Sequence, residues 1–416
     1  MSGPKSKQLR YLQEAVRLNR ARYEGLREVH RAPLRKRKLL RSLLRGGVRE
    51  LNGGKTLYVG QMSPSCRLCL RGKSTSFKLT VQCNRGCFYC PNLKGDKNTP
   101  RPENFIAYQA PSLKEVIRSV EDARSRGCSI TGGEPFLEFP RTLVYIRALR
   151  RRFGPRFRIH LYTNGLLATD RRLRRLKRAG LDEIRFDLAA IGYKTAPVYR
   201  ALKYFEHVGV EIPAVPGDEE KVKKIMLELD AAGVRYLNLN ELYFIRANVS
   251  RLKEHGFSAV CEGRRPVHDG FEGRMYPVKE SEPAAARLLA FAAKNLRRLS
   301  VHYCTCAAKR NNHDQQLKRL ARTCRKSHER IDPTGLLEKL VVRTDDPRRT
   351  ERELLAAGFP RKRIHYSRSK KRLEASVDCA KRLSSRGYLY ALVKVLPADA
   401  FADVSEHPLE SGAGRL

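Results

Sequence analysis

Strand and helix patterns alternate six times between about residues 76 and 245, and this alternation limits the possible folds more than any other feature of the chain. Short apolar runs predict strands at 77–81, 129–131, 158–162, 183–188, 210–215 and 235–240, with helical patterns between them. Repeated βα units favour a parallel sheet, and six of them suit an incomplete barrel better than a closed eight-stranded one. We therefore predict an α/β fold containing a partial (β/α)6 barrel.

Capping signals mark several of the intervening helices. Ser112 and Glu115 have the spacing of a capping box, which opens a helix that ends at Gly127. Asp170 is expected to cap a later helix that ends at Gly180. In barrels of this kind the chemistry takes place beyond the carboxyl ends of the strands, so residues that directly follow strands are the first candidates for a functional site.

The remaining sequence divides into segments on either side of the barrel. Residues 1–55 are predicted to be a basic helical N-terminal arm, either packed on the body through its leucines or free to bind nucleic acid. The core, with an upstream C-x2-C pair, covers 56–245, and a helical segment with a C-x-C pair covers 246–330. A small α+β domain is expected at 331–404, with strands at 337–342 and 388–396 and helices near 350–357 and 373–386, before a disordered tail at 405–416.

The chain carries 85 lysines and arginines against 43 acidic residues, a formal net charge of +42. Such a charge attracts polyanions, and nucleic acid is the commonest of these in a cell. A thermophile-like surface is the alternative, but that enrichment normally raises glutamate together with the basic residues. RNA or a ribonucleoprotein is therefore a candidate partner.

The N-terminal sequence MSGPKSKQLRYLQEAVRLNRARYEG has no apolar signal-peptide core, and no apolar run elsewhere approaches membrane-spanning length. We predict a cytoplasmic protein with no membrane partner. Thiols stay reduced in the cytosol, where clustered cysteines more often bind metal than form disulfides.

Three of the eleven cysteines lie in the stretch CNRGCFYCP. Cys83, Cys87 and Cys90 form a C-x3-C-x2-C set, which can hold three irons of a [4Fe–4S] cluster and leave the fourth iron open. A ferredoxin-like electron-transfer cluster is one alternative, although its spacing is C-x2-C-x2-C with a remote fourth cysteine. A zinc site with one open position is another.

These three cysteines, placed directly after the first strand of a βα series, resemble the signature of the radical S-adenosylmethionine superfamily. The sequence TGGEP at 131–135 follows the second strand and resembles the superfamily's GGE motif, while TNG at 163–165 follows the third strand, as in many members. The resemblance covers roughly residues 60–245. It is strongest to an archaeal branch described only as related to pyruvate formate-lyase activating enzyme.

The resemblance implies two cofactors, a [4Fe–4S] cluster on Cys83, Cys87 and Cys90 and S-adenosylmethionine chelated to its open iron. Reductive cleavage would release a 5′-deoxyadenosyl radical, with electrons from an external donor such as a ferredoxin or flavodoxin. The residues expected to bind S-adenosylmethionine are Gly132, Gly133, Glu134, Asn164 and Asp187. Glu134 is expected to accept from its ammonium group, and Asp187 from the ribose hydroxyls.

The sequence does not identify the substrate. Charge favours modification of RNA or of an RNA-associated protein, whereas the kinship to activating enzymes favours a glycyl-radical-type activase or a peptide maturase. A non-enzymatic iron–sulfur protein that binds RNA or transfers electrons is the alternative from another class. Asn238, Asn240 and Glu241, at the end of the sixth strand, are further candidates for the substrate pocket.

Two more cysteine pairs predict an auxiliary site. Cys66 and Cys69 form a C-x2-C pair upstream of the barrel, and Cys304 and Cys306 form a C-x-C pair after it. Two separated pairs are the usual way to build a four-thiolate site, which would hold a second [4Fe–4S] cluster or a structural zinc. Should the C-x-C pair not provide both ligands, His302 or Cys324 is a possible substitute.

Overall fold

The computed structural model describes residues 29–30, 33–92, 111–245, 247–261, 267–269, 273–395, 397 and 403–408. The chain forms two compact units. The first comprises Met1–Leu70, Ser74–Arg118 and Arg126–Asn311, and the second comprises Arg71–Lys73, Ser119–Ser125 and Asn312–Leu416.

The first unit is built on a nine-stranded sheet with the order β2-β3-β14-β9-β8-β7-β6-β5-β4. The six predicted strands are present as β4 (Ser74–Thr80), β5 (Gly127–Gly132), β6 (Arg158–Thr163), β7 (Glu183–Asp187), β8 (His207–Pro213) and β9 (Tyr236–Asn240). They pair in parallel and in sequence order. The prediction of an α/β fold with a partial barrel is therefore confirmed.

The sheet continues beyond the six predicted strands. A seventh parallel strand, β14 (Ser300–Cys304), pairs with β9, and the antiparallel strands β3 (Thr56–Val59) and β2 (Arg49–Leu51) follow at the edge. The region after β9 thus contains strands as well as the expected helices. Its short strands are β10 (Tyr243–Phe244), β11 (Val260–Cys261), β12 (Val267–Asp269) and β13 (Gly273–Pro277), and β11 pairs with β1 (Val29–His30).

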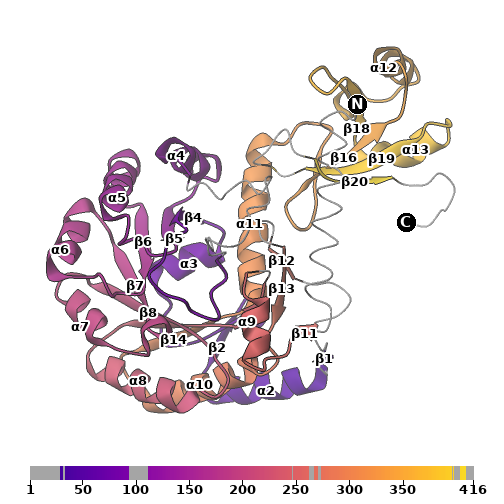
Figure 1. Cartoon of the computed structure of the whole chain (residues 1–416). Coiled ribbons are helices and arrows are strands. Elements are labelled where there is room, and N and C mark those ends of the chain that lie inside the picture. The colour runs from indigo at the N-terminus through magenta and orange to yellow at the C-terminus, as the bar shows by residue number, and fades with distance from the viewer. Residues whose placement is uncertain are drawn as a thin grey trace. The chain divides into compact units, whose positions relative to one another are not determined.

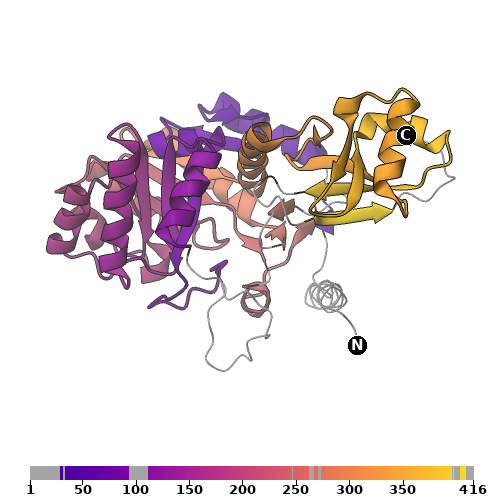
Figure 2. The ribbon, with the colours of Figure 1, turned by 90° about the horizontal axis from the view of Figure 1, so that it is seen from above.

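Helices cover the outer face of the parallel strands (Figures 1 and 2). They are α4 (Leu113–Asp122), α5 (Phe139–Phe153), α6 (Asp170–Ala179), α7 (Ala196–Leu202), α8 (Glu219–Ala231) and α10 (Ser281–Asn295). The capping box is confirmed, because Ser112 and Glu115 exchange hydrogen bonds through their side chains and backbone amides. The N-cap of α6 is Thr169, whose side chain accepts from the amide of Arg172, and Asp170 is the first helical residue instead of the predicted cap.

Helix α3 (Pro64–Leu70) lies on the inner side of the same sheet (Figure 1). Its residues Cys66 and Leu70 pack with Met62 and Ala308, near the start of α11 (Cys306–Cys324). Two further helices belong to this unit, α2 (Pro33–Arg45) and α9 (Val249–Glu254). The concave side of the sheet is therefore partly filled by the segment that precedes β4.

The second unit has its own antiparallel sheet, in the order β17-β18-β16-β19-β20, with β15 beside β16. Its elements are β15 (Arg330–Ile331), β16 (Leu337–Val342), α12 (Pro347–Ala356), β17 (Ile364–Ser367), β18 (Arg372–Ala375), α13 (Ala380–Ser384), β19 (Tyr390–Val395) and β20 (Asp403–Pro408). The helix predicted near 373–386 is wrong at its start, because 372–375 pairs with β16 and β17 as a strand. The predicted tail from residue 405 overlaps β20.

Two sequence predictions concern other parts of the chain. The first helix of the N-terminal arm, within residues 1–28, and the tail at 409–416 lie outside the described residues. Across the described ranges, every helix is too short or too polar to cross a bilayer.

Candidate active site at the carboxyl ends of the strands

The cysteine loop follows β4 at the carboxyl edge of the parallel sheet. Cys87 and Cys90 are half-buried, Cys83 is exposed, and the amide of Cys90 donates to the carbonyl of Cys87 at 3.3 Å. Burial, with smaller contributions from the nearby Asp187, Cys90 and Cys83, raises the pKa of the Cys87 thiol to about 11, although a hydrogen bond with Tyr89 lowers it. Asp187, Cys90 and Cys83 all lie near enough to Cys87 to disfavour its thiolate, and a bound cation would relieve the repulsion among these groups.

One side of the loop is fastened by α9 and the residues around it. The guanidinium of Arg251 donates to the carbonyl of Cys87 at 2.6 Å and to that of Cys90 at 3.3 Å. Asn248 donates to the carbonyl of Tyr89 at 3.0 Å, and Phe88 stacks on His255. These contacts hold the loop through its backbone carbonyls and do not involve the thiols. Sequence reasoning missed Arg251 and Asn248, since no local pattern links them to a loop about 160 residues earlier.

The other side of the loop is fastened by the end of β7. The Tyr89 hydroxyl donates to both carboxylate oxygens of Asp187, at 3.0 and 3.1 Å. Arg85 donates to the carbonyl of Ala190 at 2.7 Å, and the amide of Ala190 donates to Asp187 at 3.3 Å. Burial raises the pKa of Asp187 to about 7, although the hydrogen bond from Tyr89 lowers it. Asp187 therefore lies against the cysteine loop, and its predicted contact with the ribose stays a prediction.

The glycine pair after β5 lies against the backbone that leads into the cysteine loop. The amide of Gly133 donates to the carbonyl of Thr80 at 2.7 Å, and Asn92 donates to the carbonyl of Gly132 at 2.7 Å. A Cβ on Gly132 would lie 2.2 Å from the Thr80 oxygen, and one on Gly133 would lie 1.9 Å from the Gln82 oxygen. Only glycine permits this close approach of two backbones.

Glu134 is fully buried and holds the next loop in place. Its carboxylate accepts from the Asn164 amide at 2.8 Å, the Thr163 hydroxyl at 2.8 Å and the Phe136 amide at 3.0 Å. Burial raises its pKa, while these three donors lower it. The Asn164 side chain in turn donates to Asn84 in the cysteine loop at 2.7 Å. Glu134 thus connects the second loop to the third, and its predicted contact with an ammonium group stays a prediction.

Hydrogen bonds therefore join the loops after β4, β5, β6 and β7 into one site. The sequence profile of the radical SAM superfamily matches residues 77–241, a range that includes all four loops. This part of the chain is a radical SAM domain. Proteins of this superfamily use a [4Fe–4S] cluster and S-adenosylmethionine, and three neighbouring thiols with no fourth cysteine in the loop fit that cluster.

Several known proteins resemble the chain. MJ0021 of Methanocaldococcus jannaschii, named as a glycyl-radical enzyme activating enzyme, is 30% identical over 233 residues, which is 53% of this chain and 60% of the relative. A protein of Saccharolobus islandicus named as a GTP 3′,8-cyclase is 29% identical over 192 residues, 42% of this chain and 59% of the relative. The chain thus spans about 60% of the length of these relatives. The solved structure of Streptococcus suis SuiB bound to S-adenosylmethionine aligns at 10% identity with a TM-score of 0.38, covering 56% of this chain and 50% of SuiB.

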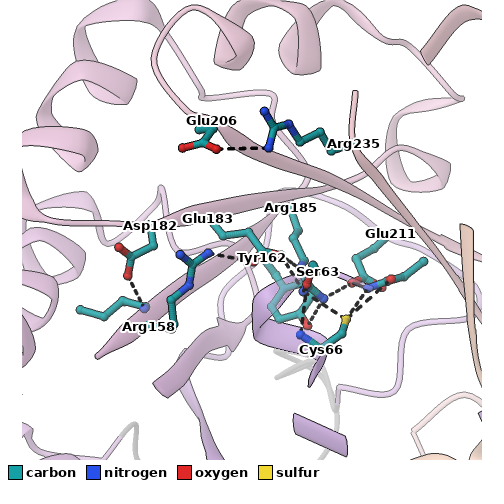
Figure 3. A network of polar contacts seen from close by, with 12 residues as sticks. Ser63, Cys66, Arg158, Tyr162, Asp182, Glu183, Arg185, Glu206, Glu211 and Arg235 are labelled. Atoms are coloured by element: carbon teal, nitrogen blue, oxygen red, sulfur yellow. Dashed lines mark hydrogen bonds and ion pairs between the residues drawn. The ribbon is translucent and has the colours of Figure 1, made fainter. Parts of the chain in front are cut away.

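A buried polar network lies on the inner face of the radical SAM domain (Figure 3). Arg185 forms ion pairs with Glu183 at 2.6 Å and Glu211 at 2.8 Å, and it donates to Ser63 at 2.7 Å and to the Cys66 sulfur at 3.2 Å. Breaking such a buried pair leaves an uncompensated charge, which costs about 3–5 kcal/mol. Arg185 therefore holds α3 against the strands, beneath the level of Asp187 on the same strand.

Asn238 and Asn240 face this network instead of an open pocket. Both side-chain amides donate to Glu211 at 2.6 Å, and Asn238 also donates to the Cys66 sulfur at 3.4 Å. Glu241 accepts from the amide of Cys306 at 2.7 Å. Their predicted contact with substrate stays a prediction.

The structure brings members of the two other cysteine pairs into one region. The pKa of Cys304 is raised to about 12, chiefly by burial; nearby Lys309 lowers it, and Cys66 is among the neighbouring groups that raise it. Cys306 lies near Cys304, whereas Cys69 lies with Cys66 near Tyr162. The alternative ligand Cys324 belongs to the second unit, where its thiol donates to the carbonyl of Pro397 at 3.2 Å.

Proposed function

We propose that this chain is an enzyme that reductively cleaves S-adenosylmethionine at a [4Fe–4S] cluster held by Cys83, Cys87 and Cys90. When bound, the cluster supplies an electron that converts S-adenosylmethionine into methionine and a 5′-deoxyadenosyl radical. The observation that carries the proposal is the fixed set of three thiols, whose loop is fastened by Arg251 on one side and Asp187 on the other.

The surrounding residues have distinct proposed roles. We assign the amino end of S-adenosylmethionine to the neighbourhood of Gly132 and Gly133, whose backbones lie against the strand end that leads into the cysteine loop, with Glu134 as a candidate acceptor. Because its carboxylate already accepts three hydrogen bonds, we assign Glu134 chiefly to orienting Asn164. Asp187 is assigned to the ribose hydroxyls, and α3 closes the barrel interior below it and excludes water there.

Partners and substrate belong to the same proposal. An external donor such as a ferredoxin or flavodoxin delivers the electron. The net charge of +42 supports RNA or an RNA-associated protein as substrate. The alternative, a glycyl-radical-type activase or peptide maturase, is supported by the name of the Methanocaldococcus relative.

We also propose a second metal site from Cys66, Cys69, Cys304 and Cys306, with His302 as a substitute ligand. The His302 ring contacts Asn238 through Nδ1 at 3.2 Å, and within the described residues its buried Nε2 has no hydrogen-bonding partner. The Cys66 sulfur accepts from Arg185 and Asn238, and such donors stabilise a thiolate ligand. Among the described residues, the ligand atoms of these side chains do not come within 4.8 Å of one another as a group of three or more. A tetrahedral zinc needs such closely spaced ligands, so we place an iron–sulfur cluster ahead of zinc at this site.

Anaerobic reconstitution with iron and sulfide tests the main proposal. The reduced wild-type protein should release 5′-deoxyadenosine from S-adenosylmethionine, whereas Cys83→Ala, Cys87→Ala and Cys90→Ala should release none and lose iron. Cys324→Ala, which removes an exposed thiol in the second unit, should change neither. Stoichiometric zinc without iron in anaerobically purified protein would refute the proposal, and so would an intact cluster that cleaves no S-adenosylmethionine.

A further inference from the structure

Helix α6 is unusually basic for its length. Six of its ten residues, DRRLRRLKRA, are arginine or lysine. Leu173, Leu176 and Ala179 are buried against the body, which leaves the basic residues on the outer side of the helix. The helix is therefore held by its apolar face and its caps, and its outer face carries almost only positive charge.

Four of these arginines share one stripe of the helix. Arg171, Arg174, Arg175 and Arg178 follow the i, i+3, i+4, i+7 spacing and are exposed. Together with Arg147 of the neighbouring helix α5 they line a hollow of about 560 Å³. Two helices packed side by side thus gather five guanidinium groups around one surface depression.

No acidic side chain in the described part of the chain neutralises the positive charge of this hollow. None of the five guanidinium groups forms an ion pair with a described carboxylate, and the nearby Asp170 is engaged by Tyr204 and Arg200. Like charges at i, i+3 and i, i+4 destabilise a helix. The clustered arginines lower the stability of the helix and have no carboxylate partner among the described residues. This indicates that they bind an anion from outside the protein.

We infer that the α5–α6 hollow is a docking site for the phosphate backbone of RNA. Guanidinium groups match phosphate with two parallel hydrogen bonds, which is why arginine is favoured over lysine where phosphates are recognised. The stripe from Arg171 to Arg178 rises about 10 Å along the helix axis, enough to follow successive phosphates of one strand. The inference extends the RNA part of the proposed function and does not depend on S-adenosylmethionine cleavage.

An acidic protein is the competing partner, and the hollow favours RNA over it. Arg172 and Arg175 lie over the ring of Phe139, with guanidinium carbons 5.2 and 5.3 Å from its centroid. Arg175 is one of the five groups that line the hollow, so this contact positions one planar guanidinium before binding, which suits a phosphate chain of fixed spacing. Carboxylates on a flexible peptide have no such regular spacing.

The test compares two triple variants with the same charge change and the same helical spacing. The first, Arg171→Gln/Arg174→Gln/Arg178→Gln, removes three charges from the hollow. The control, Lys38→Gln/Arg41→Gln/Arg45→Gln, removes three exposed charges at the same i, i+3, i+7 spacing on α2. Binding of a short fluorescein-labelled single-stranded RNA by the full-length protein is followed by anisotropy at several salt concentrations.

The α6 variant should bind RNA at least about tenfold more weakly than wild type. The slope of the logarithm of the binding constant against the logarithm of the salt concentration should become about 2 smaller in magnitude, because each lost contact with a single-strand phosphate removes about 0.7 from it. The α2 variant should lose much less. Since the α6 substitutions remove like-charge pairs, that variant should unfold at the same or a higher temperature than wild type, which separates lost binding from lost folding.

Three results would overturn the inference. Equal losses in both variants would show that binding comes from a general electrostatic field, or is shared with the N-terminal arm that contains α2, and that the hollow is not a specific site. Unchanged binding in the α6 variant would show that the hollow is not used. In a competition experiment, poly-L-glutamate and unlabelled RNA of equal charge each displace the labelled RNA. Equal effectiveness of the two competitors would assign the hollow to an acidic protein. Failure of S-adenosylmethionine cleavage in wild type with intact RNA binding would contradict only the proposed function.

Discussion

The Tyr89 hydroxyl donates to both carboxylate oxygens of Asp187, and so ties the middle of the cysteine loop to the end of β7. Burial raises the pKa of Asp187 to about 7, the hydrogen bond from Tyr89 opposes that rise, and nearby Glu211 adds to it. The protonation state of this carboxyl therefore changes near neutral pH.

The first prediction is a pH dependence of stability. Unfolded aspartate ionises near pH 4, while folded Asp187 keeps its proton to about pH 7. Its contribution to the free energy of unfolding is therefore fully present below about pH 4 and is lost as the pH rises through about 7, by at most about 1.4 kcal/mol per pH unit. In urea titrations of cluster-free protein, Asp187→Asn should remove this component. Tyr89→Phe removes the hydrogen bond that lowers the pKa of Asp187, so the stabilising contribution should persist to a pH above 7. If the stability of Tyr89→Phe depended on pH as that of wild type does, the pH dependence could not be assigned to Asp187.

The second prediction concerns the same residue as a ligand. Asp187→Asn retains the size of the side chain and an acceptor for Tyr89. Above about pH 7, where Asp187 is ionised, it removes the charge that strengthens hydrogen bonds to ribose. The affinity for S-adenosylmethionine should fall by roughly 10- to 100-fold, the equivalent of a charged hydrogen bond worth about 1.5–3 kcal/mol. The change that S-adenosylmethionine causes in the electron paramagnetic resonance spectrum of the reduced cluster measures this affinity. Iron content should stay at the wild-type value, and unaltered affinity would remove Asp187 from the binding site.

The third prediction concerns the contact between the second loop and the cysteine loop. Gly133→Ala places a Cβ 1.9 Å from the Gln82 oxygen and 2.5 Å from the Gln82 carbonyl carbon, so the backbone before Cys83 has to move. We expect the free energy of unfolding to fall by about 2 kcal/mol or more, together with poor iron uptake. Gly46→Ala is the control, because its Cβ would meet nothing closer than 3.4 Å. If Gly133→Ala were as stable as Gly46→Ala, the loop after β5 could move away from the backbone before Cys83 at no cost in free energy.

The fourth prediction concerns the anchor on α9. Arg251→Met removes the guanidinium that donates to the carbonyls of Cys87 and Cys90, so the loop should open more often. Amide hydrogen exchange in residues 83–90 of cluster-free protein should become at least about tenfold faster, as expected from losing hydrogen bonds to a charged donor worth about 1.5–3 kcal/mol. Lys224→Met, on the exposed face of α8, should leave these rates unchanged. Wild-type exchange in Arg251→Met would mean that the loop is held by other contacts.

The fifth prediction counts metal at the second site. If that site holds a cluster, reconstituted wild type should contain about eight irons per chain, and Cys66→Ala/Cys69→Ala should contain about four and still bind S-adenosylmethionine. If it holds zinc, the same substitution should remove one zinc per chain. Unchanged iron and zinc would leave Cys66 as a buried partner of Arg185 and contradict the second site.

The parallel strands of the barrel could be predicted from sequence, because apolar residues alternate along β5, β6 and β8, and the helices between the strands have capping residues and terminal glycines. The seventh parallel strand, β14, could not. Its inward residues, His302 and Cys304, are polar because the inner face also contains Arg185, Glu211 and Asn238. Val301 and Tyr303 are buried as well, but two apolar residues in a five-residue segment give too weak a periodic signal to identify a strand.

The site was predictable to a similar extent. The cysteine loop, the glycine pair and Asn164 are contiguous motifs placed directly after strands, and the structure joins them by hydrogen bonds. Arg251 and Arg185 could not be recognised, since each depends on packing between segments more than a hundred residues apart. Local patterns identify the chemical groups, whereas tertiary contacts determine which residues hold them in position.

The fastening of the cysteine loop by α9 has a consequence for biosynthesis. The loop carbonyls are held by Asn248 and Arg251, which leave the ribosome about 160 residues after the cysteines they support. A nascent chain that ends before α9 exposes three thiols on a loop without this anchor. Iron delivered at that stage would meet an unformed binding site, so the cluster is expected to be inserted after the first unit has been synthesised and folded.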